Sequence, residues 1–235
     1  MILMIHDEIF AAYPELQIAV VVVRDADNRQ TFPKVGELLR REIDMARTVF
    51  GGMAVSDHPN IRAWRAAYQH FTAASRYHSS VEALVTRAVK GKGMSRINAL
   101  VDLYNTASLK YLVPIGGEDL KTIKGNIALR RAAGDEPFTA LGSTENDPPD
   151  TGEVAYFDDA GCLCRRFNWR EADRTKLTAA TEHAIFAIEG LPPTGEIETK
   201  EAAYGLGAWI REYCGGTLNY FLLNTSCRSI EVPFP

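Results

Sequence analysis

Three polar residues in the middle of the chain have the spacing of one helix face. Asn98, Asp102 and Asn105 follow one another at intervals of four and three residues, so a helix here would place their side chains together. Amide and carboxyl groups grouped in this way can bind a polar ligand or orient a water molecule. The alternative is a structural role, in which the same groups hydrogen-bond the backbone of neighbouring loops.

A proline and a pair of glycines follow this helix. Pro114 should end it, and Gly116 and Gly117 should then form a loop. Glycine lets the backbone adopt positive φ or come close to a ligand. We therefore expect a pocket with the helix as its floor and the glycine loop as its rim.

The hydrophobic periodicity predicts an α+β fold around this helix. Helices are expected at 33–50, 61–71, 80–89, from 96 to the proline, and at 200–213. Strands are expected at 16–24, 127–131, 153–157, 162–167, 183–190, 218–223 and 229–232. Helices followed by strands with helices interspersed favour a single domain over residues 1–235, with a mixed β-sheet flanked by helices.

Basic residues are concentrated in one part of an otherwise acidic chain. The whole sequence has a formal charge of −4, whereas residues 87–131 carry nine basic and three acidic side chains. A local basic field can hold a phosphate-rich partner. An ordinary solvated surface is the alternative.

Several common catalytic sites are absent from the sequence. It has no Gly-x-Ser-x-Gly, His-Glu-x-x-His, Walker or dinucleotide-binding pattern, and its five histidines are scattered. Its four cysteines lack metal-ligand spacing and are expected to be free, buried thiols. We therefore expect no metal and no cofactor, and an enzyme of this sequence would depend on positioning and hydrogen bonding.

No apolar run approaches the roughly 20 residues that a bilayer span requires. Residues 1–5 are too short for a signal peptide and lack a basic start. The expectation is a cytoplasmic protein without a membrane partner.

A polar segment at 167–175 contains two aromatic residues. Such mixtures suit the rim of a binding site, where rigid rings lie beside hydrogen-bonding groups. Alternatively, Arg170 and Arg174 only pair with the acidic residues beside them.

The central stretch resembles the editing module, the B3/B4 domain, of the bacterial phenylalanyl-tRNA synthetase β subunit. The resemblance rests on the block 98–105, on Pro114 with the glycine pair, and on Asp119-Leu120 and Lys124-Gly125. The strand at 153–161 resembles the next one of that module. The chain is more closely similar to free-standing bacterial proteins built on this module, which share blocks at 58–59, 79–84, 96–98, 114–120 and 168–170.

The resemblance covers residues 35–215 and implies a mixed α+β fold, on which an N-terminal strand and C-terminal strands pack. In the synthetase this module hydrolyses tyrosine wrongly attached to phenylalanine tRNA, because a second pocket removes errors that the synthetic site cannot reject. The resemblance therefore implies a stand-alone hydrolase that deacylates mischarged tRNA. Its partners would be tRNA or the aminoacyl-tRNA 3′ end, and not DNA.

The resemblance also implies roles for particular residues. Asp102 and Asn105 match the family's helix, and Glu171 or Asp173 lies nearest to the family's pocket acid. Gly116 stands where the synthetase has its pocket histidine, a departure that leaves the amino acid open. The catalytic candidates are Asn105, Glu118 and Glu171. The substrate-binding candidates are Asp102, Gly116, Gly117, Asn168, Trp169, Arg170 and Asp173. The tRNA-binding candidates are Lys90, Lys92, Arg96, Lys121 and Lys124.

Two other functions remain open on the sequence. The chain could be a non-catalytic module that binds a small amino-acid-like ligand, a nucleotide or a tRNA end. It could also be a hydrolase of an unrelated amide or ester, because a fold does not determine a function.

Overall fold

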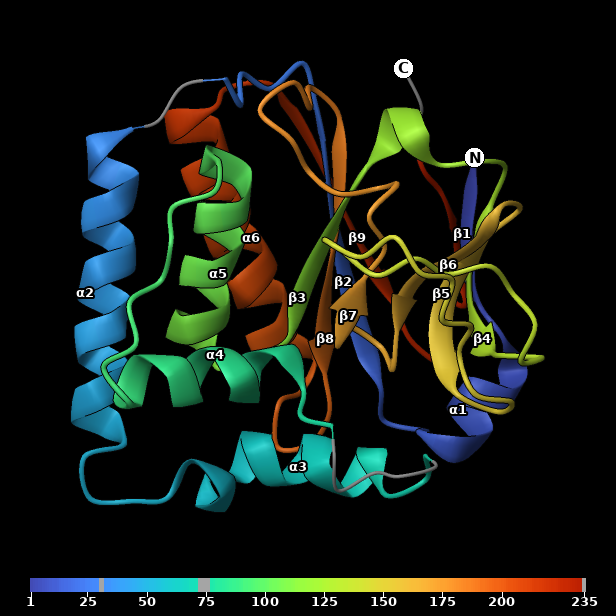
Figure 1. Ribbon diagram of the computed structural model, residues 1–235, viewed down its shortest axis with the longest axis horizontal. Coiled ribbons are helices and arrows are strands. Elements are labelled where there is room, and N and C mark those ends of the chain that lie inside the picture. The colour runs from blue at the N-terminus through green and yellow to red at the C-terminus, as the bar shows by residue number, and fades with distance from the viewer. Residues whose placement is uncertain (30–31, 72–76, 234–235) are drawn as a thin grey trace.

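The computed structural model describes the chain except for residues 30–31, 72–76 and 234–235, and it has three main layers (Figure 1). A layer of helices covers one face of a four-stranded sheet, and a six-stranded sheet lies beyond the other face. The α-helices are α1 (Asp7–Ala12), α2 (Pro33–Val49), α3 (Pro59–Tyr68), α4 (Ser80–Val89), α5 (Ala99–Tyr111) and α6 (Glu196–Tyr213). Short 3-10 turns occur at η1 (Val55–Asp57) and η3 (Leu120–Thr122).

The two sheets differ in strand direction. The strands are β1 (Ile2–Ile5), β2 (Gln17–Arg24), β3 (Ile115–Asp119), β4 (Ile127–Arg131), β5 (Val154–Asp158), β6 (Gly161–Arg165), β7 (Arg170–Glu171), β8 (Ala184–Gly190), β9 (Thr217–Leu223) and β10 (Ser229–Glu231). The smaller sheet, in the order β3-β8-β2-β9, is antiparallel. The larger sheet, in the order β10-β1-β4-β5-β6-β7, is mixed because β1 and β4 run parallel. The predicted α+β class is confirmed, but the strands form two sheets where one was expected.

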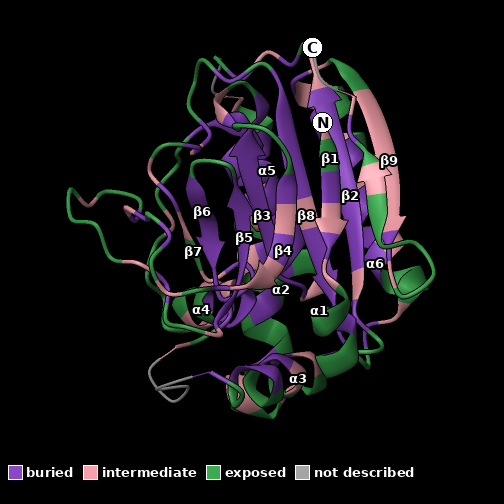
Figure 2. Cartoon of the chain, turned by 90° about the vertical axis from the view of Figure 1, so that its right-hand side faces the viewer, coloured by how far each residue is buried: buried purple, intermediate pink, exposed green. Residues whose placement is uncertain are grey.

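Strand β2 shows why the layers form. Its run of apolar residues is buried on both faces, as the sequence predicts. Ile18, Val20 and Val22 belong to the core shared with the larger sheet, whereas Val21 and Val23 pack toward α5 and α6. Because successive side chains of a strand point to opposite faces, β2 contributes to both cores. Figure 2 shows the same pattern, with buried central strands and a more exposed β9 at the edge.

The helices that border the site begin at side-chain caps. Ser79 precedes α4 and its hydroxyl accepts a hydrogen bond from the N–H of Glu82, as the capping-box pattern predicts. Asn98 precedes α5, and its side chain accepts a hydrogen bond from the N–H of Val101. Asn98 is therefore a cap and not part of the helix face.

The glycine pair is a strand and not a loop. Gly116 and Gly117 lie within β3, and neither has positive φ. A Cβ at Gly116 would overlap the side chain of Asn168, and a Cβ at Gly117 would lie 2.7 Å from the ring of Phe186. Glycine is needed here because neighbouring side chains occupy the space on both faces of the strand.

Within the described residues, no helix is both long enough and apolar enough to span a bilayer.

Candidate functional site

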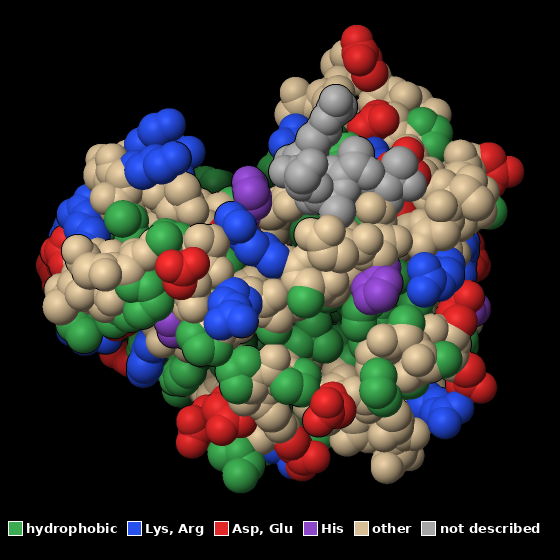
Figure 3. All heavy atoms as spheres, turned by 90° about the horizontal axis from the view of Figure 1, so that it is seen from below, with side chains coloured by type: hydrophobic (Ala, Val, Ile, Leu, Met, Phe, Trp, Pro, Cys, Tyr) green, Lys and Arg blue, Asp and Glu red, His purple; other side chains and the backbone are tan. Residues whose placement is uncertain are grey.

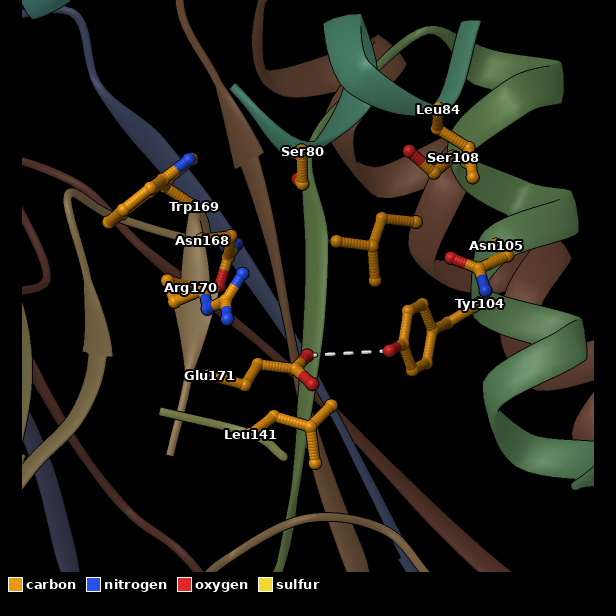
Figure 4. A pocket seen from close by; sticks show the side chains of 11 residues that line it. Ser80, Leu84, Tyr104, Asn105, Ser108, Leu141, Asn168, Trp169, Arg170 and Glu171 are labelled. Atoms are coloured by element: carbon orange, nitrogen blue, oxygen red, sulfur yellow. Dashed lines mark hydrogen bonds between the residues drawn. The ribbon is translucent and has the colours of Figure 1, made fainter. Parts of the chain in front are cut away.

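A pocket of about 240 Å³ opens between α4, α5 and the segment that leads into β7 (Figure 4). This volume is smaller than the roughly 300–1,000 Å³ of typical drug-sized ligand sites, so it suits a group of amino-acid size. The lining residues are Ser80, Leu84, Tyr104, Asn105, Ser108, Ile115, Leu141, Asn168, Trp169, Arg170 and Glu171.

Helix α5 forms one wall of the pocket. Tyr104, Asn105 and Ser108 share the face that Figure 4 shows on the right. The Ser108 hydroxyl donates to the carbonyl of Val113 at 2.7 Å, so it holds the end of the helix. The Tyr104 hydroxyl donates to Oε1 of Glu171 across the pocket at 3.3 Å.

The opposite wall depends on an unusual turn after β6. Arg166 and Phe167 have φ of 46° and 59°, in the left-handed region that non-glycine residues seldom adopt. Each such residue costs roughly 1–3 kcal/mol. The turn presents Asn168, Trp169 and Arg170 to the pocket.

Burial of the two strained residues holds this turn in place. Phe167 packs edge-on against Trp64 with ring centroids 5.2 Å apart. The Arg166 guanidinium is fully buried, pairs with Glu153 at 2.9 Å and lies 3.6 Å from the ring centre of Tyr77. Contacts with buried residues therefore hold this wall of the pocket in place.

The loop before β5 closes the lower side of the pocket through Leu141. The N–H of Leu141 donates to the carbonyl of Glu171 at 2.9 Å, and the N–H of Asp173 donates to the carbonyl of Thr139 at 2.9 Å. The loop over residues 134–151 is thus bonded to the strand that carries Glu171.

Carboxyl groups dominate the electrostatics of the site. Burial raises the pKa of Glu171 from 4.5 to about 7, while the Gly117 N–H and the Tyr104 hydroxyl act to lower it. Burial, and next the charge of Glu171, raises the pKa of Glu118 well above 4.5. The pocket therefore contains a carboxyl that changes charge near neutral pH.

A third carboxyl lies behind the pocket. Glu189 is fully buried on β8 and accepts a hydrogen bond from the Tyr156 hydroxyl at 2.8 Å. Burial raises its pKa from 4.5 to about 8, against hydrogen bonds from Tyr156 and Asn168. Asn168 therefore stands between this group and the pocket.

Some predicted site residues meet in the pocket. Those that line it are Asn105, Asn168, Trp169, Arg170 and Glu171. Glu118 and Gly116 instead border a narrow cavity of about 30 Å³ between the sheets, which shares Asn168 with the pocket.

Other predicted residues lie elsewhere. Asp102 is buried against the Arg96 side chain and the N–H of Ile97, so it holds the segment before α5. Gly117 does not line the pocket and its Cα faces Phe186, although its N–H bonds the Glu171 carboxyl. Asp173 forms an ion pair with Lys176 at 2.9 Å and does not line the pocket.

The predicted tRNA-binding residues do not form one surface. Arg96 is paired with Asp102, and Lys121 is paired with Glu182 at 2.6 Å. The turn η3, between Asp119 and Lys124, lies at the top of Figure 1, whereas α4, which precedes Lys90 and Lys92, lies below. Figure 3 shows Lys and Arg side chains dispersed among acidic ones on the lower face.

Sequence reasoning missed several lining residues. These are Ser80, Leu84, Tyr104, Ser108, Ile115 and Leu141. Tyr104 could have been predicted because it is next to Asn105 in the sequence. Ser108 could have been predicted because it follows Asn105 by about one helical turn. Leu141 could not have been predicted, since only tertiary hydrogen bonds bring its loop to β7.

Among the residues that the structure describes, no group of three or more His, Cys, Asp or Glu side chains could hold a metal ion. Cys162, Cys164 and Cys214 are free and buried as expected, but Cys227 is exposed.

The geometry defines an α+β domain with a polar pocket of amino-acid size. Residues 63–213 match the family described as the B3/4 domain, and the chain belongs to that family. No curated protein matches it.

Among solved structures, an N-terminal fragment of the phenylalanyl-tRNA synthetase β subunit from Pyrococcus horikoshii is similar, with a TM-score of 0.50 and 13% identity. The match covers 92% of this chain and 49% of that one, so this chain spans about half the length of that structure. At this identity the similarity is one of fold. It confirms the predicted resemblance to the B3/B4 domain of that subunit.

Proposed function

We propose that this protein is a stand-alone editing hydrolase that removes a wrongly attached amino acid from tRNA. The observation that carries the proposal is the carboxyl of Glu171 in the wall of an amino-acid-sized pocket, with a pKa of about 7. Membership of the B3/4 domain family, and a fold shared with a synthetase fragment, support an aminoacyl ester as the substrate.

In this proposal Glu171 accepts a proton from a water molecule that attacks the ester carbonyl. A carboxylate whose pKa lies near the working pH suits general base catalysis. The amide groups of Asn105 and Asn168 hold the amino acid and the oxygen that becomes negatively charged. The bond between the carbonyl carbon and the ribose oxygen breaks, and that oxygen takes up a proton. The products are free amino acid and uncharged tRNA.

Deacylation of a panel of mischarged tRNAs tests the proposal. The wild-type protein should release at least one amino acid faster than buffer does. Glu171→Gln keeps the shape of the side chain but cannot accept the proton, so it should slow release by roughly 10²–10⁴-fold. Glu145→Gln, the same change at an exposed residue, is the matched control.

The alternative is a module that binds without turnover. It predicts that an amino acid or aminoacyl-adenosine analogue raises the melting temperature of the protein while every mischarged tRNA stays intact. That combination of results contradicts a hydrolase.

A further inference from the structure

A second cavity, of about 440 Å³, lies between α2 and residues 93–96. It is larger than the candidate pocket of about 240 Å³. Its polar wall consists of Arg40, Asp44, Arg47 and Arg96, and we call it the arginine groove. In Figure 1 the chain that leaves α4 runs upward past α2 to the start of α5, and this segment forms one side of the groove.

Gly36 in α2 leaves the space that one arginine of the groove occupies. Glycine inside a helix costs roughly 0.5–1 kcal/mol relative to alanine, yet Gly36 lies within the first two turns of α2. A Cβ at this position would overlap the guanidinium of Arg96. The glycine therefore allows Arg96 to lie against the helix.

Two guanidinium groups in the groove are held by hydrogen bonds. Arg96 bonds to the buried carboxyl of Asp102 and to the carbonyl of Phe32 at 3.2 Å. Arg47 donates to the carbonyl of Ala88 at 3.0 Å, and its other contact, with Asp44 at 2.9 Å, is exposed. Ordering these side chains in advance lowers the entropy that a ligand must overcome on binding.

Arg40 adds a positive charge between them. Among the described residues, no carboxylate lies within ion-pair distance of its guanidinium. The exposed Lys90 and Lys92 follow α4 and lead into the same segment. Only Asp44 contributes a negative charge to the lining.

The groove and the candidate pocket lie at opposite ends of α4. Ser80 and Leu84, near its start, line the pocket, whereas Ala88, near its end, accepts the hydrogen bond from Arg47. Eight residues of α-helix span roughly 12 Å. A single RNA strand whose 3′ end occupies the pocket could therefore reach the groove a few nucleotides earlier.

We propose that the arginine groove binds the phosphate backbone of the RNA strand that leads into the pocket. The proposal rests on the function proposed above and names the surface that holds the tRNA. Guanidinium groups match phosphate in two-pronged geometry, and the apolar floor formed by Leu39, Ile43 and Met94 suits contact with ribose or base. Arg40 and Arg47 line this groove, whereas Lys121 and Lys124 do not.

Salt-dependent binding of fluorescent tRNA tests the groove. The dissociation constant should rise with salt, with a slope of roughly 0.7–0.9 in its logarithm for each phosphate contact. Arg40→Gln combined with Arg47→Gln should lower this slope by one or two contacts and weaken binding at low salt by at least fivefold. If the double variant unfolds, the single variant Arg40→Gln, at an exposed residue, provides the same comparison with a smaller effect. Arg228→Gln removes the same charge beside α1, on the other side of the molecule, and should leave the slope unchanged.

A second substrate separates this proposal from the first. An aminoacyl methyl ester has no phosphates, so its hydrolysis should be the same in Arg40→Gln as in the wild type. Equal loss of tRNA affinity in Arg40→Gln and Arg228→Gln overturns the groove, as does absence of tRNA binding, even if the small ester is hydrolysed. Groove-dependent tRNA binding without any deacylation supports the groove and overturns the hydrolase.

Discussion

At the scale of single residues, Glu171 is the group whose charge should control the reaction. Its pKa of about 7 is set by burial against the lowering effects of the Gly117 N–H and the Tyr104 hydroxyl. If the carboxylate is the base, the deacylation rate should rise with pH and level off above about 7. Because the charge of Glu171 also raises the pKa of Glu118, the midpoint of the pH–rate profile reflects the titration of both carboxyls.

Removal of the Tyr104 hydroxyl tests this assignment. Tyr104→Phe takes away a hydrogen bond to the carboxylate, so the pKa of Glu171 should rise and the midpoint of the pH–rate profile should move to higher pH. Tyr156→Phe removes a similar buried hydroxyl that bonds Glu189 instead, and it should leave the midpoint in place. A downward or absent shift in Tyr104→Phe argues against Glu171 as the base.

At the scale of elements, β3 carries two glycines with different duties. Gly116 gives room to Asn168, which lines the pocket, and Gly117 gives room to Phe186, which lies in the core beneath the helices. Gly116→Ala should displace Asn168 and reduce deacylation by at least tenfold in protein that is still folded. Gly117→Ala should destabilise the fold by roughly 1–3 kcal/mol and change the activity of the folded protein much less.

Thermal melting and assays below the melting temperature separate the two effects. Asn168 is only 7% exposed, so its displacement by a new methyl group moves the pocket wall itself. Identical activity losses in both variants would show that the two faces of β3 are not independent.

The same strand shows what local patterns can and cannot predict. Strand β2 was predictable from its continuous run of β-branched residues, and α5 from apolar residues at helical spacing. β3 was not, because a Gly-Gly pair after a proline ordinarily marks a turn. Its extended conformation depends on pairing with β8 and on side chains from residues 168 and 186, which are distant in the sequence.

The site residues likewise fall into those that the sequence could predict and those that it could not. Asn105, Asn168, Trp169, Arg170 and Glu171 were predictable from residue type and family resemblance, and all line the pocket. The positions of Asp102 and Asp173 depend on Arg96 and Lys176, whose ion pairs no local pattern reveals. Only the three-dimensional structure distinguishes the residues that line the pocket from residues of suitable type that lie elsewhere.

At the scale of the whole molecule, buried carboxyls between the layers should make the protein less stable as pH rises. Burial raises the pKa of Glu171 to about 7 and that of Glu189 to about 8, from 4.5. The folded state therefore binds protons that the unfolded state has released. This stabilisation is complete below pH 4.5 and is lost as pH rises through about 7 and about 8.

The free energy of unfolding should consequently fall by roughly 2–3 kcal/mol between pH 6.5 and 8.5. The lowered pKa of His58 acts in the opposite sense only below its ordinary value of 6.5, so it does not mask the effect. Urea denaturation at intervals of half a pH unit measures the slope. Glu189→Gln keeps an acceptor for the Tyr156 hydroxyl but stays neutral, so it should remove most of the decline, whereas the exposed Glu145→Gln should not. A wild-type stability that is constant or increasing across this range would mean that these carboxyls are solvated, and that the layers are less tightly closed around them than their burial indicates.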